Sequence, residues 1–150
     1  MKEIDSKLDG EEHINIYTKG KTRLGRLLTN LSELPVTHPV YGTFRCAEGL
    51  WYYLKTGCKH ENLRALSGFE AKKYGRTLEV VWNKHMQEDF WTAAKSKVMN
   101  DQELFGLFVS SDLPFEHYYL YGTKVVREKS TGWLVEKYEE LREQLQGATK

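Results

Sequence analysis

The chain has 150 residues, a length that suits one folded domain with a real core. Its composition, 40% hydrophobic and 29% charged, is that of an ordinary globular protein, and the formal net charge of +1 excludes a general electrostatic attraction to nucleic acid. The sequence has no apolar run long enough to cross a membrane and no signal-like start, so we expect a cytoplasmic protein without a membrane partner.

The beginning of the chain is predicted to contain two short strands. Residues 1–13 are mostly polar and are expected to form a flexible segment, followed by one domain over residues 14–150. Residues 14–17 alternate in polarity, which favours a strand, and residues 40–44 favour a second one. Residues 32–39 contain two prolines and are expected to be loop.

From residue 46 onward the apolar residues recur every three to four positions, which predicts helices. The first helix is expected over residues 46–57 and ends at Gly57. The later elements are expected to be a short helix at 62–66, a turn or two at 69–74, a strong helix at 89–99, a further helix from 100 or 101 through 108, a loop at 110–116, strand-like residues 118–126 broken at Gly122, and an amphipathic helix at 131–146.

Glu48 is the most informative residue of the first predicted helix. Trp51, Tyr52 and Lys55 follow it at helical spacings and share its side of the helix. A carboxylate beside two large rings suits a site in which the rings hold a base and the acid acts on a sugar. The plain alternative is an acid in the first turn that complements the helix dipole, and the sequence leaves both open.

Three cations, Lys72, Lys73 and Arg76, gather at the end of the segment that contains Gly75. They either compensate a helix C-terminus or bind phosphate, with Arg76 as a forked donor and a lysine as a point charge. The helix at 89–99 is predicted to belong to the core, with Trp91, Val98 and Met99 packing inward.

The sequence predicts neither a metal site nor a cofactor. His85 and His117 have no partner at ligand spacing, and two cysteines cannot close a structural zinc site. Cys46 and Cys58 are expected to be reduced thiols of the core, as is usual in a cytosolic protein.

Taken in chain order, several short motifs resemble those of the NADAR family, also called YbiA-like. They cover about residues 14–145 and include the opening residues 14–20. The others are Thr29-Asn30-Leu31, Glu48 followed by Leu50-Trp51-Tyr52, Ala71-Lys72-Lys73-Tyr74-Gly75-Arg76, and Trp91 with Met99 eight residues later. This chain differs from the family at the last motif. Where the family has Asp-x-x-Trp-Gly, the chain has Tyr118-Tyr119-Leu120-Tyr121-Gly122, so the acid is missing and Tyr121 replaces the Trp. The candidates to replace that acid are Asp112, Glu116 and His117.

The resemblance implies a mainly α fold with a small antiparallel β element, a YbiA-like α+β domain. It also implies a metal-independent hydrolase, an N-glycosidase that removes ADP-ribose from a modified nucleobase, guanine especially, in DNA or RNA, as phage-type members do against DNA-modifying toxins. The alternatives are hydrolysis of phosphorylated riboflavin-biosynthesis intermediates, or a non-catalytic module that binds ADP-ribose or a nucleotide. The implied catalytic residues are Glu48 and Trp91, and the implied substrate-binding residues are Tyr17, Lys19, Asn30, Trp51, Tyr52, Lys72, Arg76 and Tyr121.

Overall fold

The computed structural model of the protein describes residues 3–148. They form two compact units: unit 1 combines the two ends of the chain, up to Thr29 and from Glu103, and unit 2 is the continuous segment from Asn30 to Gln102. Helices dominate, and the described strands pair two at a time. The α+β class expected from the sequence is confirmed. The domain boundary expected after residue 13 stays a prediction, and residues 1–2 and 149–150 of the two expected ranges lie outside the described residues.

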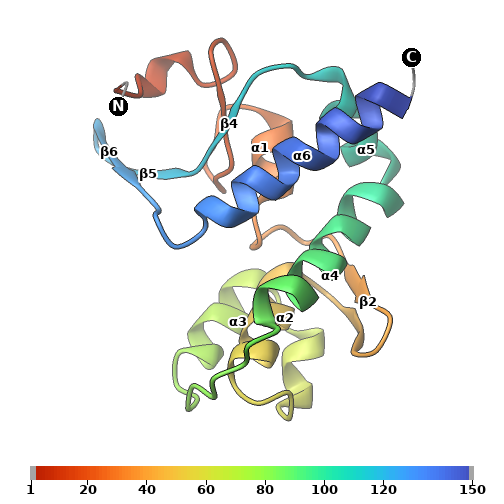
Figure 1. Cartoon of the computed structure of the whole chain (residues 1–150). Coiled ribbons are helices and arrows are strands. Elements are labelled where there is room, and N and C mark those ends of the chain that lie inside the picture. The colour runs from red at the N-terminus through yellow and green to blue at the C-terminus, as the bar shows by residue number, and fades with distance from the viewer. Residues whose placement is uncertain (1–2, 149–150) are drawn as a thin grey trace. The chain divides into compact units, whose positions relative to one another are not determined.

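Unit 2 consists of a β-hairpin and a group of helices (Figure 1). In chain order its elements are β2 (Val36–His38), β3 (Gly42–Phe44), α2 (Ala47–Lys55), the 3-10 helix η2 (Glu61–Ala65), α3 (Gly68–Gly75) and α4 (Met86–Asn100). β2 and β3 are antiparallel, with Val36 opposite Phe44. Helix α2 packs against α3 and α4, so it is the element that connects the unit.

Apolar residues at helical spacing form the core of unit 2. Leu50 and Leu54 of α2 are fully buried, and so are Phe90, Ala94 and Val98 of α4, which follow one another every four residues. Burial of one such large side chain stabilises the fold by about 1.5–3 kcal/mol. The two buried faces therefore fix which sides of α2 and α4 remain available to other groups.

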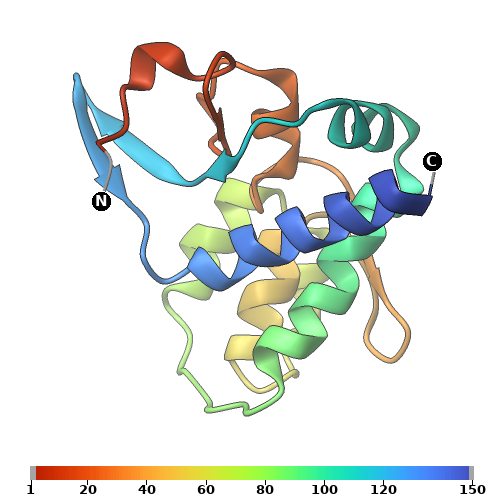
Figure 2. The same ribbon diagram turned by 45° about the horizontal axis from the view of Figure 1, so that its top comes forward.

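Unit 1 contains the long C-terminal helix and two small sheets (Figure 2). Its elements are η1 (Ser6–Leu8), β1 (Ile14–Asn15), α1 (Arg23–Leu28), α5 (Gln102–Ser110, whose first residue belongs to unit 2), β4 (Phe115–Glu116), β5 (Tyr118–Tyr121), β6 (Lys124–Arg127) and α6 (Gly132–Ala148). β1 runs parallel to β4, and β5 pairs antiparallel with β6. Helix α1 approaches β1 closely, because a Cβ on Gly25 would lie 2.1 Å from the carbonyl oxygen of Asn15.

Several local expectations differ from the structure. The expected loops at 32–39 and 110–116 contain β2 and β4, and the expected helix at 62–66 is the 3-10 helix η2. These strands are only two or three residues long. β4 relies on β1, a partner distant in sequence that no local pattern reveals, whereas β2 forms a short hairpin with the nearby β3. Met99, expected to pack inward, is 44% exposed because the buried face of α4 passes through Val98 instead.

The N-terminal residues expected to be flexible contain bonded structure between Asp5 and His13. The side chain of Asp5 caps η1 by accepting a hydrogen bond from the amide of Lys7. Asp9 is buried and accepts hydrogen bonds from the amides of Asn15 and Lys21. These contacts connect the first residues to β1 and to the turn that follows it.

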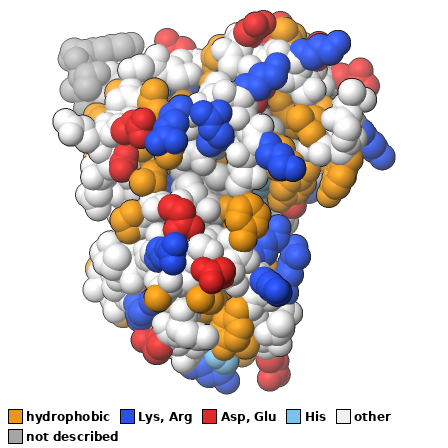
Figure 3. Space-filling view, turned by 180° about the vertical axis from the view of Figure 1, so that it is seen from behind, with side chains coloured by type: hydrophobic (Ala, Val, Ile, Leu, Met, Phe, Trp, Pro, Cys, Tyr) orange, Lys and Arg blue, Asp and Glu red, His pale blue; other side chains and the backbone are white. Residues whose placement is uncertain are grey.

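The surface carries no extended region of one charge on the face shown in Figure 3. Lysine and arginine side chains alternate there with acidic and apolar ones, in keeping with the formal net charge of +1. None of the helices within residues 3–148 is both long and apolar enough to cross a membrane. On this face, a charged ligand would be recognised by a local cluster of side chains.

Candidate functional site

Helix α2 places Glu48 in its first turn. The helix begins after Cys46, whose side chain provides no cap, and the amide of Glu48 donates instead to the carbonyl oxygen of Asn30 at 2.9 Å. An acid at this position interacts favourably with the helix dipole. Glu48 is half-buried, so its carboxylate is neither in bulk water nor wholly enclosed.

Helix α3 brings two cations toward that carboxylate. It begins with a capping box, in which Ser67 and Glu70 bond each other's backbone amides, and it ends at Arg76. Lys72 lies in its last turn and is half-buried, whereas Arg76 is exposed. Both positive charges act on Glu48, as does Lys55 at the end of α2.

The contact between α2 and α3 depends on Tyr52 and Gly75. A Cβ at Gly75 would lie only 2.2 Å from the ring of Tyr52, so the backbone of α3 rests directly on that ring. Tyr52 is buried, and Arg76 forms a hydrogen bond with its hydroxyl group. Lys55 stands over the same ring at 5.6 Å from its centre. Tyr52 therefore holds the cations in place beside Glu48 and exposes little of its own surface.

Burial raises the pKa of Glu48 to about 7, and the charges of Lys72, Arg76 and Lys55 only partly oppose this shift. Desolvation disfavours the ionised form, and neighbouring cations favour it. A glutamate whose pKa lies near neutrality exchanges a proton readily at physiological pH. Strong pKa shifts of this kind are more frequent at functional sites than on ordinary surfaces.

Asn30 contributes an acceptor without a partner. Its side-chain oxygen Oδ1 is buried and has no hydrogen-bond partner among residues 3–148. Most buried polar atoms are paired, so this acceptor is an exception, and it is able to accept a hydrogen bond from a donor group that binds beside it. The carbonyl oxygen of Asn30 also accepts a hydrogen bond from the amide of Glu48, so the two residues lie side by side.

The two tryptophans named by the sequence lie on different helices of unit 2. Trp51 of α2 meets Phe90 of α4 edge to face, with 5.2 Å between the ring centres. Trp91 is the next residue of α4 and is half-buried. The structure thus brings Glu48, Lys72 and Arg76 together, whereas a contact between Trp91 and Glu48 stays a prediction.

Three of the predicted binding residues belong to unit 1. Tyr17 meets Tyr119 edge to face at 5.7 Å, Lys19 is exposed, and Tyr121 is 67% exposed at the end of β5. Their part in a site with Glu48 stays a prediction. The candidate replacements for the missing acid also lie in unit 1. Each has a partner of its own there: Asp112 accepts from Gln146, Glu116 pairs with Arg127, and His117 bonds Thr131.

Lys97 is a titratable group that the sequence reasoning missed. It is 1% exposed, and burial lowers its pKa to about 7, although the Cys46 thiolate would favour its charge. Its ammonium group donates to the hydroxyl of Ser32 at 3.4 Å. A signal was present in the sequence, because Phe90, Ala94 and Lys97 recur at helical spacing and share the buried face.

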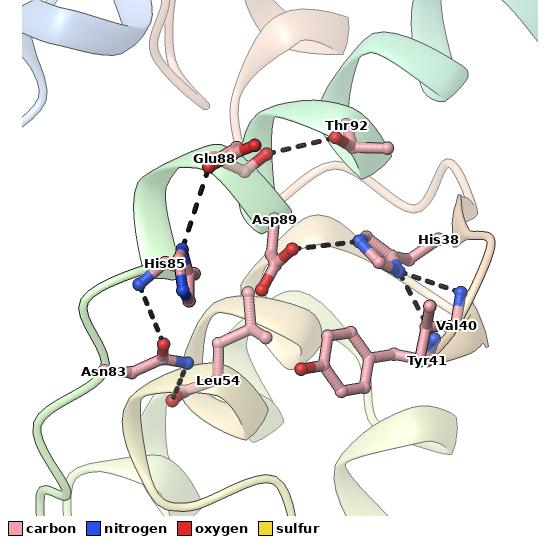
Figure 4. Close-up of polar contacts among 9 residues, drawn as sticks. All are labelled: His38, Val40, Tyr41, Leu54, Asn83, His85, Glu88, Asp89 and Thr92. Atoms are coloured by element: carbon pink, nitrogen blue, oxygen red, sulfur yellow. Dashed lines mark hydrogen bonds and ion pairs between the residues drawn. The ribbon is translucent and has the colours of Figure 1, made fainter.

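A second polar cluster joins the start of α4 to the β2–β3 turn (Figure 4). The ring nitrogen Nδ1 of His38 accepts from the amides of Val40 and Tyr41, so Nε2 carries the proton and donates to Asp89 at 3.3 Å. Every polar atom of this histidine is used within the fold. We therefore regard the His38–Asp89 pair as structural.

The cysteines and the metal-ligand types give no further site. Cys46 and Cys58 are free, and burial raises the pKa of both thiols, which makes them poor nucleophiles. Both thiols were expected in the core; Cys46 is buried there, whereas Cys58 is only half-buried. Residues 3–148 contain no group of three or more His, Cys, Asp or Glu side chains arranged to hold a metal ion.

Comparison with solved structures shows a similar fold in the E. coli protein YbiA, known from an NMR structure. The two share 20% sequence identity and a TM-score of 0.67 over 90% of this chain and 85% of that one. No protein-family model matches the chain, and no curated protein matches its sequence. The chain therefore has a YbiA-like fold, as the motif resemblance implied.

Proposed function

We propose that the protein is an N-glycosidase that hydrolyses the bond between a ribose C1′ and a base nitrogen, with Glu48 as the catalytic carboxylate. The observation that carries this proposal is the pKa of Glu48, raised to about 7 by burial beside three cations. The YbiA-like fold is in keeping with it. A surface glutamate that merely complemented a helix dipole would have no reason to be desolvated in this way.

The reaction needs a group that stabilises positive charge on the sugar. As the C1′–N bond breaks, the ribose acquires oxocarbenium character, and an ionised carboxylate near C1′ lowers the energy of that state. The same carboxylate then takes a proton from the water that adds to C1′ and returns it to the nitrogen of the departing base, so that Glu48 is ionised again at the end of the reaction. Because the pKa of Glu48 is about 7, a substantial fraction of the molecules holds the required ionised form at neutral pH.

The neighbouring residues suit the rest of a nucleotide. Lys72 and Arg76 provide a point charge and a forked donor for phosphate, and both are close enough to influence Glu48. The unpartnered Oδ1 of Asn30 is available to accept a hydrogen bond from a ribose hydroxyl group. We infer that the substrate carries ADP-ribose on a nucleobase, since this moiety combines a ribose with two phosphates.

Replacement of the carboxylate tests the mechanism. Glu48→Gln keeps the size of the side chain but cannot ionise, so we expect at least a ~100-fold loss of kcat on an oligonucleotide that carries ADP-ribose on guanine. The KM should change little. A matched control is Glu136→Gln, an exposed glutamate on α6, which should retain full turnover. Turnover by Glu48→Gln within threefold of the parent would remove Glu48 from the mechanism.

The pH dependence of wild-type activity is a second test of the role of Glu48. We expect kcat/KM to rise with pH and to level off above about 7, because the ionised form of Glu48 is the active one.

The phosphate role of Arg76 is tested by comparing ligands. Arg76→Ala should weaken binding of ADP-ribose by about tenfold or more, since a charge-assisted hydrogen bond is lost, and should affect adenosine much less. Calorimetric titration of both ligands measures the difference. Equal losses for the two would show that Arg76 supports the fold through Tyr52 rather than binding phosphate.

A further inference from the structure

Trp82 is the most exposed large apolar side chain of the described residues, at 82%. It lies in the segment that joins α3 to α4, where Val80 and Val81 are also exposed. Scattered apolar residues are common on surfaces, but here three exposed apolar residues follow one another in sequence and include an open indole, and we call them the Trp82 patch. Such a patch suggests a contact with something that the isolated chain does not contain.

The backbone on both sides of Trp82 is fixed to the end of α2. The amide of Val81 donates to the carbonyl oxygen of Lys55 at 2.9 Å. Figure 4 shows Asn83 held from two directions, since its side chain donates to the carbonyl oxygen of Leu54 and accepts from the amide of His85. Trp82 therefore projects from an anchored segment, and a ligand that stacks on it need not order the segment first.

The same segment starts at the candidate site. Arg76 is the C-cap of α3 and one of the cations beside Glu48, and Trp82 is only six positions further along the chain. Six steps along the chain span at most about 22 Å even when it is fully extended. Lys55, which anchors Val81 through its backbone, also acts on Glu48 through its charge. The segment that carries Trp82 thus starts at the candidate site and is attached to the end of α2.

The surroundings of Trp82 are mainly basic. Lys59 lies alongside Val81, because both would contact a Cβ placed on Gly57, at 3.8 Å and 3.4 Å. Lys84 follows two residues after Trp82 and is exposed, and the exposed acid of the segment is Glu79. An aromatic platform next to lysines is the arrangement that proteins use to bind single-stranded nucleic acid.

We propose that Trp82 is a stacking subsite for an unpaired base of a single-stranded nucleic acid whose modified nucleotide occupies the Glu48 site, with Lys59 and Lys84 contacting the phosphates between them. This inference rests on the proposed function and specifies its substrate: a strand, rather than a free nucleotide. Charge decides against a protein partner that uses this patch, since an apolar interface core is usually depleted of lysine.

Binding of an unmodified strand tests the subsite directly. The probe is a fluorescein-labelled single-stranded deoxyoligonucleotide of about 12 nucleotides, followed by fluorescence anisotropy. We expect Trp82→Ala to weaken binding by about 5- to 100-fold and Trp82→Phe, which keeps a ring, by less than about threefold. Phe69→Ala is the matched control, an exposed aromatic residue at the opposite end of α3, and should bind as the parent does.

Two further measurements separate the alternatives. Lys59→Ala combined with Lys84→Ala should reduce the salt dependence of binding, because fewer counterions are released. Unchanged affinity in Trp82→Ala, or an equal loss for duplex DNA, would overturn the proposal. Self-association that Trp82→Ala abolishes while strand binding persists would also overturn it and would identify the patch as an interface between copies.

The subsite and the glycosidase activity fail independently. The unmodified strand has no bond to cleave, so its binding reports on Trp82 alone, and Glu48→Gln should bind it as the parent does. Strand binding that depends on Trp82 without any turnover would support the subsite and contradict the glycosidase. Turnover that depends on Glu48, together with an unchanged affinity of Trp82→Ala for the unmodified strand, would support the glycosidase and contradict the subsite.

Discussion

Unit 1 buries Asp9, His13 and Asn15, and each is hydrogen-bonded within the unit, whereas unit 2 holds Glu48 and Lys97, whose ionised forms are disfavoured by burial. These three buried groups of unit 1 serve the fold. The imidazole Nε2 of His13 is 2.6 Å from the hydroxyl of Tyr118, and the side chain of Asn15 bonds both the amide and the carbonyl oxygen of the same tyrosine.

The difference teaches how to separate structural from functional polar groups in this chain. A buried group that is fully paired contributes to stability and tolerates no change. A desolvated group that its neighbours do not compensate lowers stability, and it persists where activity needs its shifted pKa. The Asp9, His13 and Asn15 network fits the first description and the Glu48 cluster fits the second, so substitutions in these two clusters should have opposite effects on stability.

The largest effect on stability is expected in unit 1, from Asn15→Ala. The substitution leaves the backbone amide and carbonyl of Tyr118 without their partners in a buried place, which costs about 2–5 kcal/mol in total. Chemical denaturation monitored by circular dichroism measures the loss. Asn62→Ala, at an exposed asparagine in η2, is the control and should be neutral. A loss below about 1 kcal/mol would contradict the structural reading of unit 1.

Glu48→Gln should do the opposite and stabilise the protein at alkaline pH. Burial raises the pKa of Glu48 to about 7 in the folded protein, whereas the ordinary pKa of a free glutamate side chain is 4.5. The wild type therefore loses stability as the pH rises through this window, and the glutamine variant does not. The advantage of the variant should be small below pH 4.5 and reach about 2–3 kcal/mol above pH 7.

That stability difference is measured by denaturation at several pH values in parallel. Glu136→Gln should show no comparable dependence, because this glutamate is exposed. A variant that gains nothing at high pH would mean that Glu48 is solvated after all, and the contrast between the two units would disappear.

The parts of the site that the sequence predicted are those set by local spacing. Glu48 and Tyr52 share a side of one helix, and Lys72 and Arg76 occupy the end of the next, so helical periodicity and end signals were enough to find them. The contact that joins these helices was not readable in the same way. It depends on Gly75 lying against Tyr52, a tertiary contact that appears only when the helices pack.

Lys97 and β4 show why other features escaped. A lysine in a helix is ordinarily solvent-exposed, so its place on the buried side of α4 contradicts composition-based reasoning. The two residues of β4 acquire their extended pairing only from β1, about one hundred positions earlier in the chain. For β4 the decisive information is therefore tertiary, whereas for Lys97 the helical spacing with Phe90 and Ala94 was a signal that the residue type concealed.

The smallest effect is expected at the surface of unit 1, where Arg23 and Glu103 form an ion pair at 3.0 Å with both side chains 55% exposed. Water and salt screen such a pair, so Glu103→Ala should cost no more than about 0.5–1 kcal/mol. A double-mutant cycle with Arg23→Ala isolates the coupling. Since neither charge is desolvated, the cycle should approach zero in concentrated salt, unlike the buried network of Asn15. A coupling energy as large as the loss of stability in Asn15→Ala would show that exposure to water does not decide how much a polar contact in unit 1 contributes to stability.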